Sequence, residues 1–134
     1  METGPFLFLT PMKKFSLFTG SLIAAKSVGL GAFGAHAWKD YLRSINRLET
    51  FETAARYQMY GGLILILLGV WQMQISNKYL KTAGYLVFTG SIIFPGALYL
   101  ICMTQNVLWG AVAPLGGLAY ITGLGLMAYA TLKQ

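Results

Sequence analysis

The sequence predicts an all-α integral membrane protein, in which four transmembrane helices form a bundle and a short amphipathic helix lies between the first two spans. Of the 134 residues, 56% are hydrophobic and 10% are charged, whereas a soluble domain carries about 25% charged residues. Almost all charges fall in three short segments. The apolar runs between them are near or above the roughly 20 residues that cross a hydrocarbon core of about 30 Å. Residues 1–134 are therefore interpreted as a single transmembrane domain.

The expected spans cover residues 15–37, 53–75, 82–103 and 107–131. The second span is expected to be the most apolar because it contains the run LILILLGVW, and the fourth span carries no charge. Short polar turns near residues 76–79 and 104–106 join the last three spans. Each of these helices must therefore run antiparallel to its neighbour in the sequence.

The residues before the first span are interpreted as an N-terminal extension, residues 1–11. From Met12 the chain also resembles a secretory signal, with two lysines, an apolar stretch and Ala35-His36-Ala37 as a small-x-small cleavage site. Cleavage is disfavoured because Lys26 interrupts the apolar stretch. Loss of the first helix would also leave three spans with an unpaired bundle face.

The segment between the first two spans has the pattern of a short helix that lies in the headgroup layer. Its apolar face is formed by Trp38, Tyr41, Leu42, Ile45 and Leu48. Its polar face is formed by Lys39, Asp40, Arg43, Asn46 and Arg47. Thr50 is then expected to cap the second membrane helix.

The stretch GLGAFGAH, residues 29–36, matches the G-x-G-x-x-G pattern of dinucleotide-binding turns. That motif requires a preceding strand and a βαβ frame, and the residues before it show no period-2 alternation. Small residues instead favour close helix packing in lipid, where the hydrophobic effect does not press helices together. The expected helix-packing residues are Ser27, Gly31 and Ala35 on the first helix and the pairs Ala113/Gly117 and Ala119/Gly123 on the fourth.

Two further features concern helix shape and symmetry. Pro95 and Pro114 lie inside the third and fourth spans, where each removes a backbone donor and is expected to kink its helix. LFTGSLI at residues 17–23 resembles VFTGSII at residues 87–93. Either two parallel repeats of a helix hairpin or chance similarity between apolar segments accounts for this echo.

Lys26 lies near the midpoint of the first span. A lysine at that depth costs about 2.5 to 3.5 kcal/mol on the insertion scale. The large apolar residues of this helix return about 0.3 to 0.6 kcal/mol each, so the sum is close to zero. No carboxylate of the chain lies at a matching depth. Three roles remain open for Lys26: contact with a partner protein, an internal polar plug, and a transport or proton site.

A second candidate group lies where the first helix ends and the second begins, because these ends should meet at one membrane face. Its members are His36, Glu49, Glu52, Arg56, Tyr57, Gln58 and Tyr60. One histidine with two carboxylates is able to bind a metal weakly or to relay a proton, but a structural network is the favoured interpretation. The sequence contains no Ser-His-Asp arrangement, CxxC pair or H-x-x-x-H pattern, so no enzymatic activity, catalytic residue, cofactor or metal site is assigned.

The formal net charge of +6 raises the question of nucleic-acid binding. The lysines and arginines flank apolar spans, however, and acidic residues lie among them near residues 38–57. Basic residues in such places meet anionic lipid headgroups. Membrane lipid is therefore the expected partner and nucleic acid is not. The side of the membrane that carries the two termini has five basic residues, and the opposite side has four. Because basic residues are enriched on the cytoplasmic side, this count favours both termini inside the cell.

Four stretches of the chain are distinctive: GAFGAHAWKD, ETFETAARYQMYGGLILILLG, PGALYLI and APLGGLAYITGLGLMAYA. Across roughly residues 13–132 they resemble a family of small bacterial inner-membrane proteins called domain of unknown function 423, to which eukaryotic transmembrane protein 256 looks related. The resemblance implies a four-helix membrane protein and no established activity. Two departures stand out. The family typically has a second histidine where this chain has Gly61, and it is apolar where this chain has Lys26.

We therefore expect a non-enzymatic accessory or assembly subunit of the bacterial inner membrane, which packs in the membrane against copies of itself or a larger complex. The alternative is a small oligomeric transporter or channel that uses Lys26 and the group His36, Glu52 and Arg56.

Overall fold

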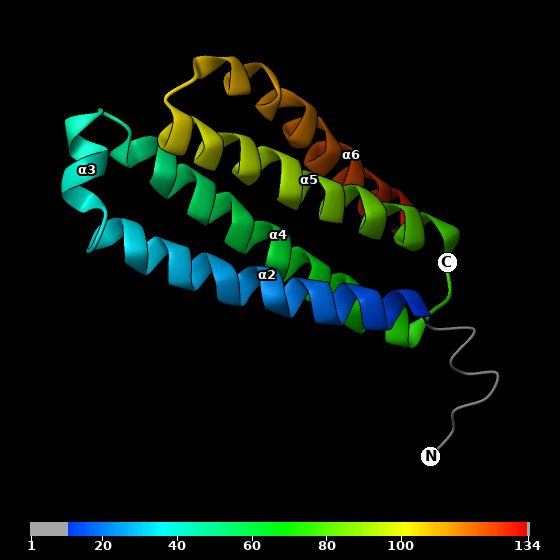
Figure 1. Ribbon diagram of the computed structural model, residues 1–134. Helices are drawn as coiled ribbons and strands as arrows, with labels where there is room; N and C mark the ends of the chain where they lie inside the picture. Colours follow the sequence, from blue (N-terminus) through cyan, green and yellow to red (C-terminus); the bar gives the residue numbers. More distant parts are fainter. Residues whose placement is uncertain (1–10, 134) are drawn as a thin grey trace.

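The computed structural model describes residues 11–133, and every regular element in that range is a helix. In chain order the elements are α2 (Pro11–Ala35), α3 (Lys39–Ser44), α4 (Leu48–Gln74), α5 (Lys78–Thr104), the 3-10 helix η1 (Val107–Ala111) and α6 (Ala113–Thr131) (Figure 1). No strand occurs between residues 11 and 133, so the all-α prediction is confirmed. The expected N-terminal extension lies outside the described residues, except that its last residue begins α2.

The four long helices pack in the order α2, α4, α5, α6 (Figure 1). The largest contacts are those of α2 with α4 and of α5 with α6, and the contact of α4 with α5 joins the two pairs. We call the end where α2 begins and α6 ends the lysine end, because Lys13, Lys14, Lys78, Lys81 and Lys133 lie there. The opposite end carries α3 and η1 and is called the α3 end.

Two clusters of buried side chains hold the helices together. The larger cluster draws on all four long helices and contains Ile23, Leu65, Leu68, Leu80, Ala83, Val87, Tyr120 and Ala130. The smaller cluster lies at the α3 end and is centred on Leu42, Phe51 and Cys102. All five residues of the apolar face expected between residues 38 and 48 belong to this cluster or pack against it. Protein side chains therefore cover much of that face.

Three segments are long and apolar enough to cross a membrane, judged by length and composition: Met12–Ala35, Lys78–Thr104 and Val107–Thr131. The helix α4 is not among them, although it has 27 residues. Its charged first turns and the polar Gln58, Gln72 and Gln74 offset the LILILL run. The expectation that the second span is the most apolar is therefore wrong, since the highest mean hydropathy of the three segments, 2.0, belongs to α5.

Three helix ends show how local residues set the boundaries. The helix α4 begins at Leu48, so Thr50 lies within its first turn and does not cap it as expected. Pro114 lies in the first turn of α6, where a missing N–H breaks no helical hydrogen bond, so the expected kink at Pro114 is also wrong. Asn77 caps α5, because its side-chain oxygen accepts the backbone N–H groups of Tyr79 and Leu80 at 2.7 and 3.4 Å.

The helices of each pair approach most closely at glycines. A Cβ atom added at Gly20 would lie 2.7 Å from the carbonyl oxygen of Gly62, so α2 and α4 touch backbone to backbone. A Cβ atom added at Gly90 would lie 2.9 Å from the carbonyl oxygen of Gly116, so α5 and α6 touch in the same way. The two echo segments, residues 17–23 and 87–93, thus supply equivalent glycines to the two helix pairs.

Candidate functional site

The predicted polar residues do not form one site. Lys26 is exposed on α2, and it precedes His36 by ten positions, which correspond to about 15 Å along a helix axis. His36 is exposed beyond the end of α2. Glu49, Glu52 and Arg56 are exposed on the first turns of α4 and line a shallow hollow of about 660 Å³ together with Arg43, Asn46, Arg47 and neighbouring α4 residues. His36 and Lys26 are not part of this hollow.

The hollow at the α3 end gathers charges of both signs on an open surface. Among residues 11–133, no group of three His, Cys, Asp or Glu side chains is arranged to hold a metal ion. The three arginines and two carboxylates of the hollow lie beside one end of the segments that are long and apolar enough to cross a membrane.

Tyr57, Gln58 and Tyr60 are consecutive or nearly so on α4 but face different surroundings. Gln58 is buried, with 4% of its surface exposed, and its side-chain oxygen accepts a hydrogen bond from the Tyr99 hydroxyl of α5 at 2.9 Å. Tyr57 and Tyr60 are partly exposed. The Tyr57 carbonyl nevertheless accepts the Tyr120 hydroxyl of α6 at 2.6 Å. Both hydrogen bonds tie α4 to the α5–α6 pair.

The surroundings of Gly61 leave no room for the histidine that the resembling family typically has at this position. A Cβ atom at Gly61 would lie 2.5 Å from the Tyr120 hydroxyl oxygen and 2.6 Å from the Ser91 Cβ. The Tyr120 hydroxyl thus occupies the space that a side chain at residue 61 would need. A second histidine does not fit beside Tyr120 in this arrangement.

Two further sets of hydrogen bonds join helices at the two ends. At the α3 end the Tyr41 hydroxyl donates to the Cys102 carbonyl at 3.2 Å, and the Cys102 thiol donates to the Arg47 carbonyl at 3.8 Å. At the lysine end the Ser16 hydroxyl donates to the Gln72 side-chain oxygen at 3.0 Å, and the Gln72 amide donates to the Leu80 carbonyl at 3.3 Å. Within the described part of the chain, no buried side-chain nitrogen or oxygen lacks a hydrogen-bond partner.

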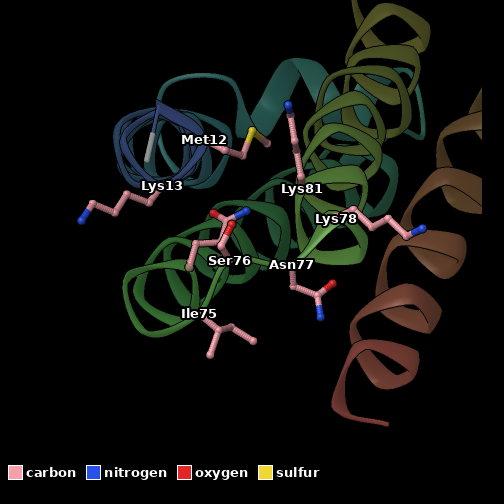
Figure 2. A pocket seen from close by; sticks show the side chains of 8 residues that line it. Met12, Lys13, Ile75, Ser76, Asn77, Lys78 and Lys81 are labelled. Atoms are coloured by element: carbon pink, nitrogen blue, oxygen red, sulfur yellow. The ribbon is translucent and has the colours of Figure 1, made fainter. Parts of the chain in front are cut away.

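A second hollow, of about 260 Å³, opens at the lysine end between the start of α2 and the α4–α5 turn. Its lining includes Lys13, Lys78 and Lys81 beside the polar Gln72, Ser76 and Asn77. Figure 2 shows that the three lysine side chains extend in different directions, away from one another. They do not converge on a common point, so this hollow is not a preformed anion site.

The expected helix-packing residues lie on two separate interfaces. On α2, Ser27 is buried, Gly31 is half-buried and Ala35 is exposed. A Cβ atom added at Gly31 would lie 3.8 Å from the Cβ atom of Ala55, which is an ordinary contact distance. On α6, Ala113 and Gly123 are buried while Gly117 and Ala119 are half-buried. A Cβ atom at Gly123 would meet Val87 of α5 at 2.8 Å. The small residues of α6 thus serve the contact with α5.

Sequence reasoning missed several residues that join the helices. Tyr99, Tyr120 and Gln72 make interhelical hydrogen bonds, and Gly20 and Gly62 bring the backbones of α2 and α4 into contact. A usable signal was present in the sequence. Glutamines inside long apolar runs require hydrogen-bond partners. The TGS triplets at residues 19–21 and 89–91 and the GGL triplets at residues 61–63 and 116–118 contain the glycines at which the two helix pairs touch.

Comparisons with known proteins agree with this picture. The sequence model of the family described as "Protein of unknown function (DUF423)" matches residues 30–117. The UPF0382 membrane protein of Staphylococcus haemolyticus is 40% identical over 120 residues, which cover 90% of this chain and 97% of the relative. The UPF0382 membrane protein YwdK of Bacillus subtilis is 36% identical over 123 residues, which cover 91% of this chain and 98% of the relative. No solved structure matches the chain significantly.

Proposed function

This chain belongs to the DUF423 family, and we propose that it is a non-enzymatic accessory or assembly subunit of a bacterial inner membrane. In this role it packs against copies of itself or against a larger membrane complex. Its named relatives are membrane proteins of bacteria, which supports the membrane location.

The proposed topology has four transmembrane spans, including α4. The helix α4 lies between α2 and α5, and both of these neighbours contain segments able to cross a membrane. Residues 75–77 join α4 to α5 directly, so α4 must return through the same layer. Its glutamines are tolerable there because Gln58 and Gln72 bond to α5. The short α3 is proposed to lie in the headgroup layer at the α3 end.

One observation carries the subunit proposal: the polar groups of the helix interior are engaged in helix–helix hydrogen bonds. Gln58, Gln72 and Tyr120 each bond to another helix. Most charged residues, in contrast, are exposed, either at the two ends of the bundle or, in the case of Lys26, on α2; Lys13 is buried, and Lys39 and Arg47 are half-buried. This distribution supports a scaffold with an outward-facing polar surface rather than an internal reaction or transport path.

The test is native mass spectrometry of the full-length protein, extracted from its own membrane in a mild detergent. We expect a complex of fixed stoichiometry that contains several copies of the chain or a larger assembly. A folded monomer that retains lipid and no protein would contradict the proposal.

A reconstitution experiment tests the alternative of transport. The purified protein is placed in liposomes, and the flux of ions or small solutes is measured for the wild type, Lys26→Leu and His36→Ala. We expect no flux above that of empty liposomes. A flux that either substitution changes would favour a transporter or channel over the subunit.

A further inference from the structure

We propose that the outward face of α2 around Lys26 binds a transmembrane helix of a different membrane protein, and that this helix carries an aspartate or glutamate at the depth of Lys26. The inference rests on the proposed subunit function and names the chemistry of its partner. The exposed intramembrane charge of Lys26 carries the argument.

Lys26 lies on the side of α2 that the rest of the chain leaves uncovered. Its neighbours Ile23 and Ser27 are buried, because they lie on the face that packs within the protein. Lys26 itself is exposed, and the nearby Leu22 and Val28 expose 54% and 61% of their surfaces. In a membrane this face meets lipid or another protein.

The depth of Lys26 prevents an easy escape to water. The span Met12–Ala35 has 24 residues, so its centre falls between residues 23 and 24. At 1.5 Å per residue, Lys26 lies roughly 4 Å from that centre and about 11 Å inside a core with a half-thickness of about 15 Å. Helical side chains also lean toward the helix N-terminus, which directs the lysine stem away from the nearer surface at the α3 end.

Within residues 11–133, no carboxylate lies at the depth of Lys26. The described carboxylates are Asp40, Glu49 and Glu52, which all lie at the α3 end, and Glu2 precedes the span in the sequence. The hydroxyl of the adjacent Ser27 already donates to the Ala24 carbonyl at 2.7 Å. A charged side chain in a membrane pairs with another polar group or faces a water-filled cavity. Here that partner must come from outside the chain.

A second copy of this chain does not meet the requirement. The three membrane-capable segments contain no Asp or Glu, and the carboxylates of α4 lie in its first two turns. In a parallel dimer through this face, Lys26 would approach Lys26 of the other copy, and like charges repel. A helix of another protein with a buried carboxylate supplies the complementary charge.

The surface beside Lys26 also has room for a close helix. Ser21, Ala25 and Gly29 recur every four residues and are exposed. Apart from the neighbouring backbone of α2 itself, no atom lies within 4 Å of the place where a Cβ atom of Gly29 would be. Small residues at this spacing let a neighbouring helix backbone approach, which would bring a short acidic side chain within reach of Lys26.

The experiment is photocrosslinking in the native membrane, with a photoreactive amino acid at Leu22 of the full-length chain and, as a matched control, at the exposed Ile92 of α5. We expect the probe at Leu22 to capture a transmembrane segment of another protein that contains Asp or Glu, and the probe at Ile92 not to capture it. Lys26→Leu should lower this crosslink by roughly tenfold or more, whereas Lys26→Arg should retain it. Lys26→Leu makes α2 more apolar, so loss of the crosslink would not reflect loss of insertion.

Charge exchange decides the result. Lys26→Glu should abolish the crosslink, and replacement of the captured acidic residue by lysine should restore it. Crosslinks to another copy of this chain or to lipid alone would overturn the inference, even if native mass spectrometry shows a homo-oligomer and so supports the subunit function. A partner captured equally well by Lys26→Leu would also overturn it. Absence of any complex in both experiments would overturn the inference and the proposed function together.

Discussion

At Gly20 and Gly62 the backbones of α2 and α4 are in contact, and this contact sets the distance between the two helices. A methyl group at Gly20 would meet a carbonyl oxygen and a backbone nitrogen of α4 at 2.7 and 2.9 Å. Backbone atoms cannot rotate away as the end of a flexible side chain can. Relief therefore requires the helices to separate, which would disturb the packing of neighbouring side chains.

Gly20→Ala should lower the free energy of unfolding by about 1 to 3 kcal/mol, as overpacking does in well-packed interiors. Gly29→Ala on the same helix is the matched control, because open space surrounds its Cβ position. The measurement is reversible unfolding of the purified protein in detergent. Equal stabilities of the two variants would contradict the crossing at Gly20.

Tyr120→Phe should lower the free energy of unfolding by about 0.5 to 1.5 kcal/mol, because the Tyr57 carbonyl loses its hydroxyl donor. Tyr85→Phe is the control, since the Tyr85 side chain is 51% exposed. The same unfolding assay compares both variants with the wild type. An unchanged Tyr120→Phe protein would mean that the hydroxyl contributes no net stability.

Among single residues, the sequence identified Lys26 as an isolated charge, because hydropathy alone places a lysine at that depth. It did not identify Tyr99 and Tyr120 as partners of α4. Their hydrogen bonds join residues 41 and 63 positions apart, and such pairings depend on how the helices are arranged in space. Whether His36 lies beside Glu49 and Glu52 also depends on this spatial arrangement, and His36 does not line the hollow that contains the two glutamates.

At the scale of the helices, backbone conformation at the ends can be tested separately from packing. Gln105 follows α5 with φ of 58°, in the left-handed region, and its N–H bonds to the Ile101 carbonyl at 2.8 Å. Residues with a Cβ atom are strained in this conformation, and glycine is not. The position therefore has the geometry of a glycine C-cap but carries a glutamine.

Gln105→Gly should raise the free energy of unfolding by up to about 1 kcal/mol. Gln74→Gly should lower it, by no more than the roughly 0.5 to 1 kcal/mol that glycine costs in the middle of a helix, because Gln74 is the last residue within α4. The two variants make the same chemical change with opposite expected signs in one thermal or denaturant unfolding series. A loss of stability in Gln105→Gly would contradict the cap assignment.

The existence and order of the long helices followed from the alternation of apolar runs with polar turns. The start of α4 did not, because hydropathy marks where lipid begins and not where the helix begins. The helix continues through its charged first turns, where Leu48 and Phe51 pack into the cluster around Leu42. Hydropathy also does not predict which helices pack together, namely α2 with α4 and α5 with α6.

For the whole molecule, the two ends differ in charge. The lysine end carries five lysines in the described part of the chain, and the α3 end carries four basic residues together with Asp40, Glu49 and Glu52. The count of basic residues favours the lysine end in the cytoplasm. Both termini are then expected on the cytoplasmic side.

Ser76→Cys and Ser44→Cys form a matched pair that tests this orientation, because both serines are exposed and lie at opposite ends. A membrane-impermeant maleimide is added to cells whose cytoplasmic membrane is intact and accessible from outside. It should label Ser44→Cys and not Ser76→Cys. The native Cys102 is buried and provides the unlabelled background. The reverse labelling pattern would invert the topology.

The glycine crossing within each helix pair has a consequence for how the protein could be assembled from pieces. Residues 75–77 are the turn that joins the two pairs covalently, while Gly20–Gly62 and Gly90–Gly116 secure each pair from within. Polypeptides 1–76 and 77–134, encoded by two separate genes, should each insert as a hairpin and then associate through α4 and α5. Recovery of both fragments on a tag carried by one of them would show that the chain is divisible at this turn, whereas degradation of either fragment in the presence of the other would show that the turn itself is indispensable.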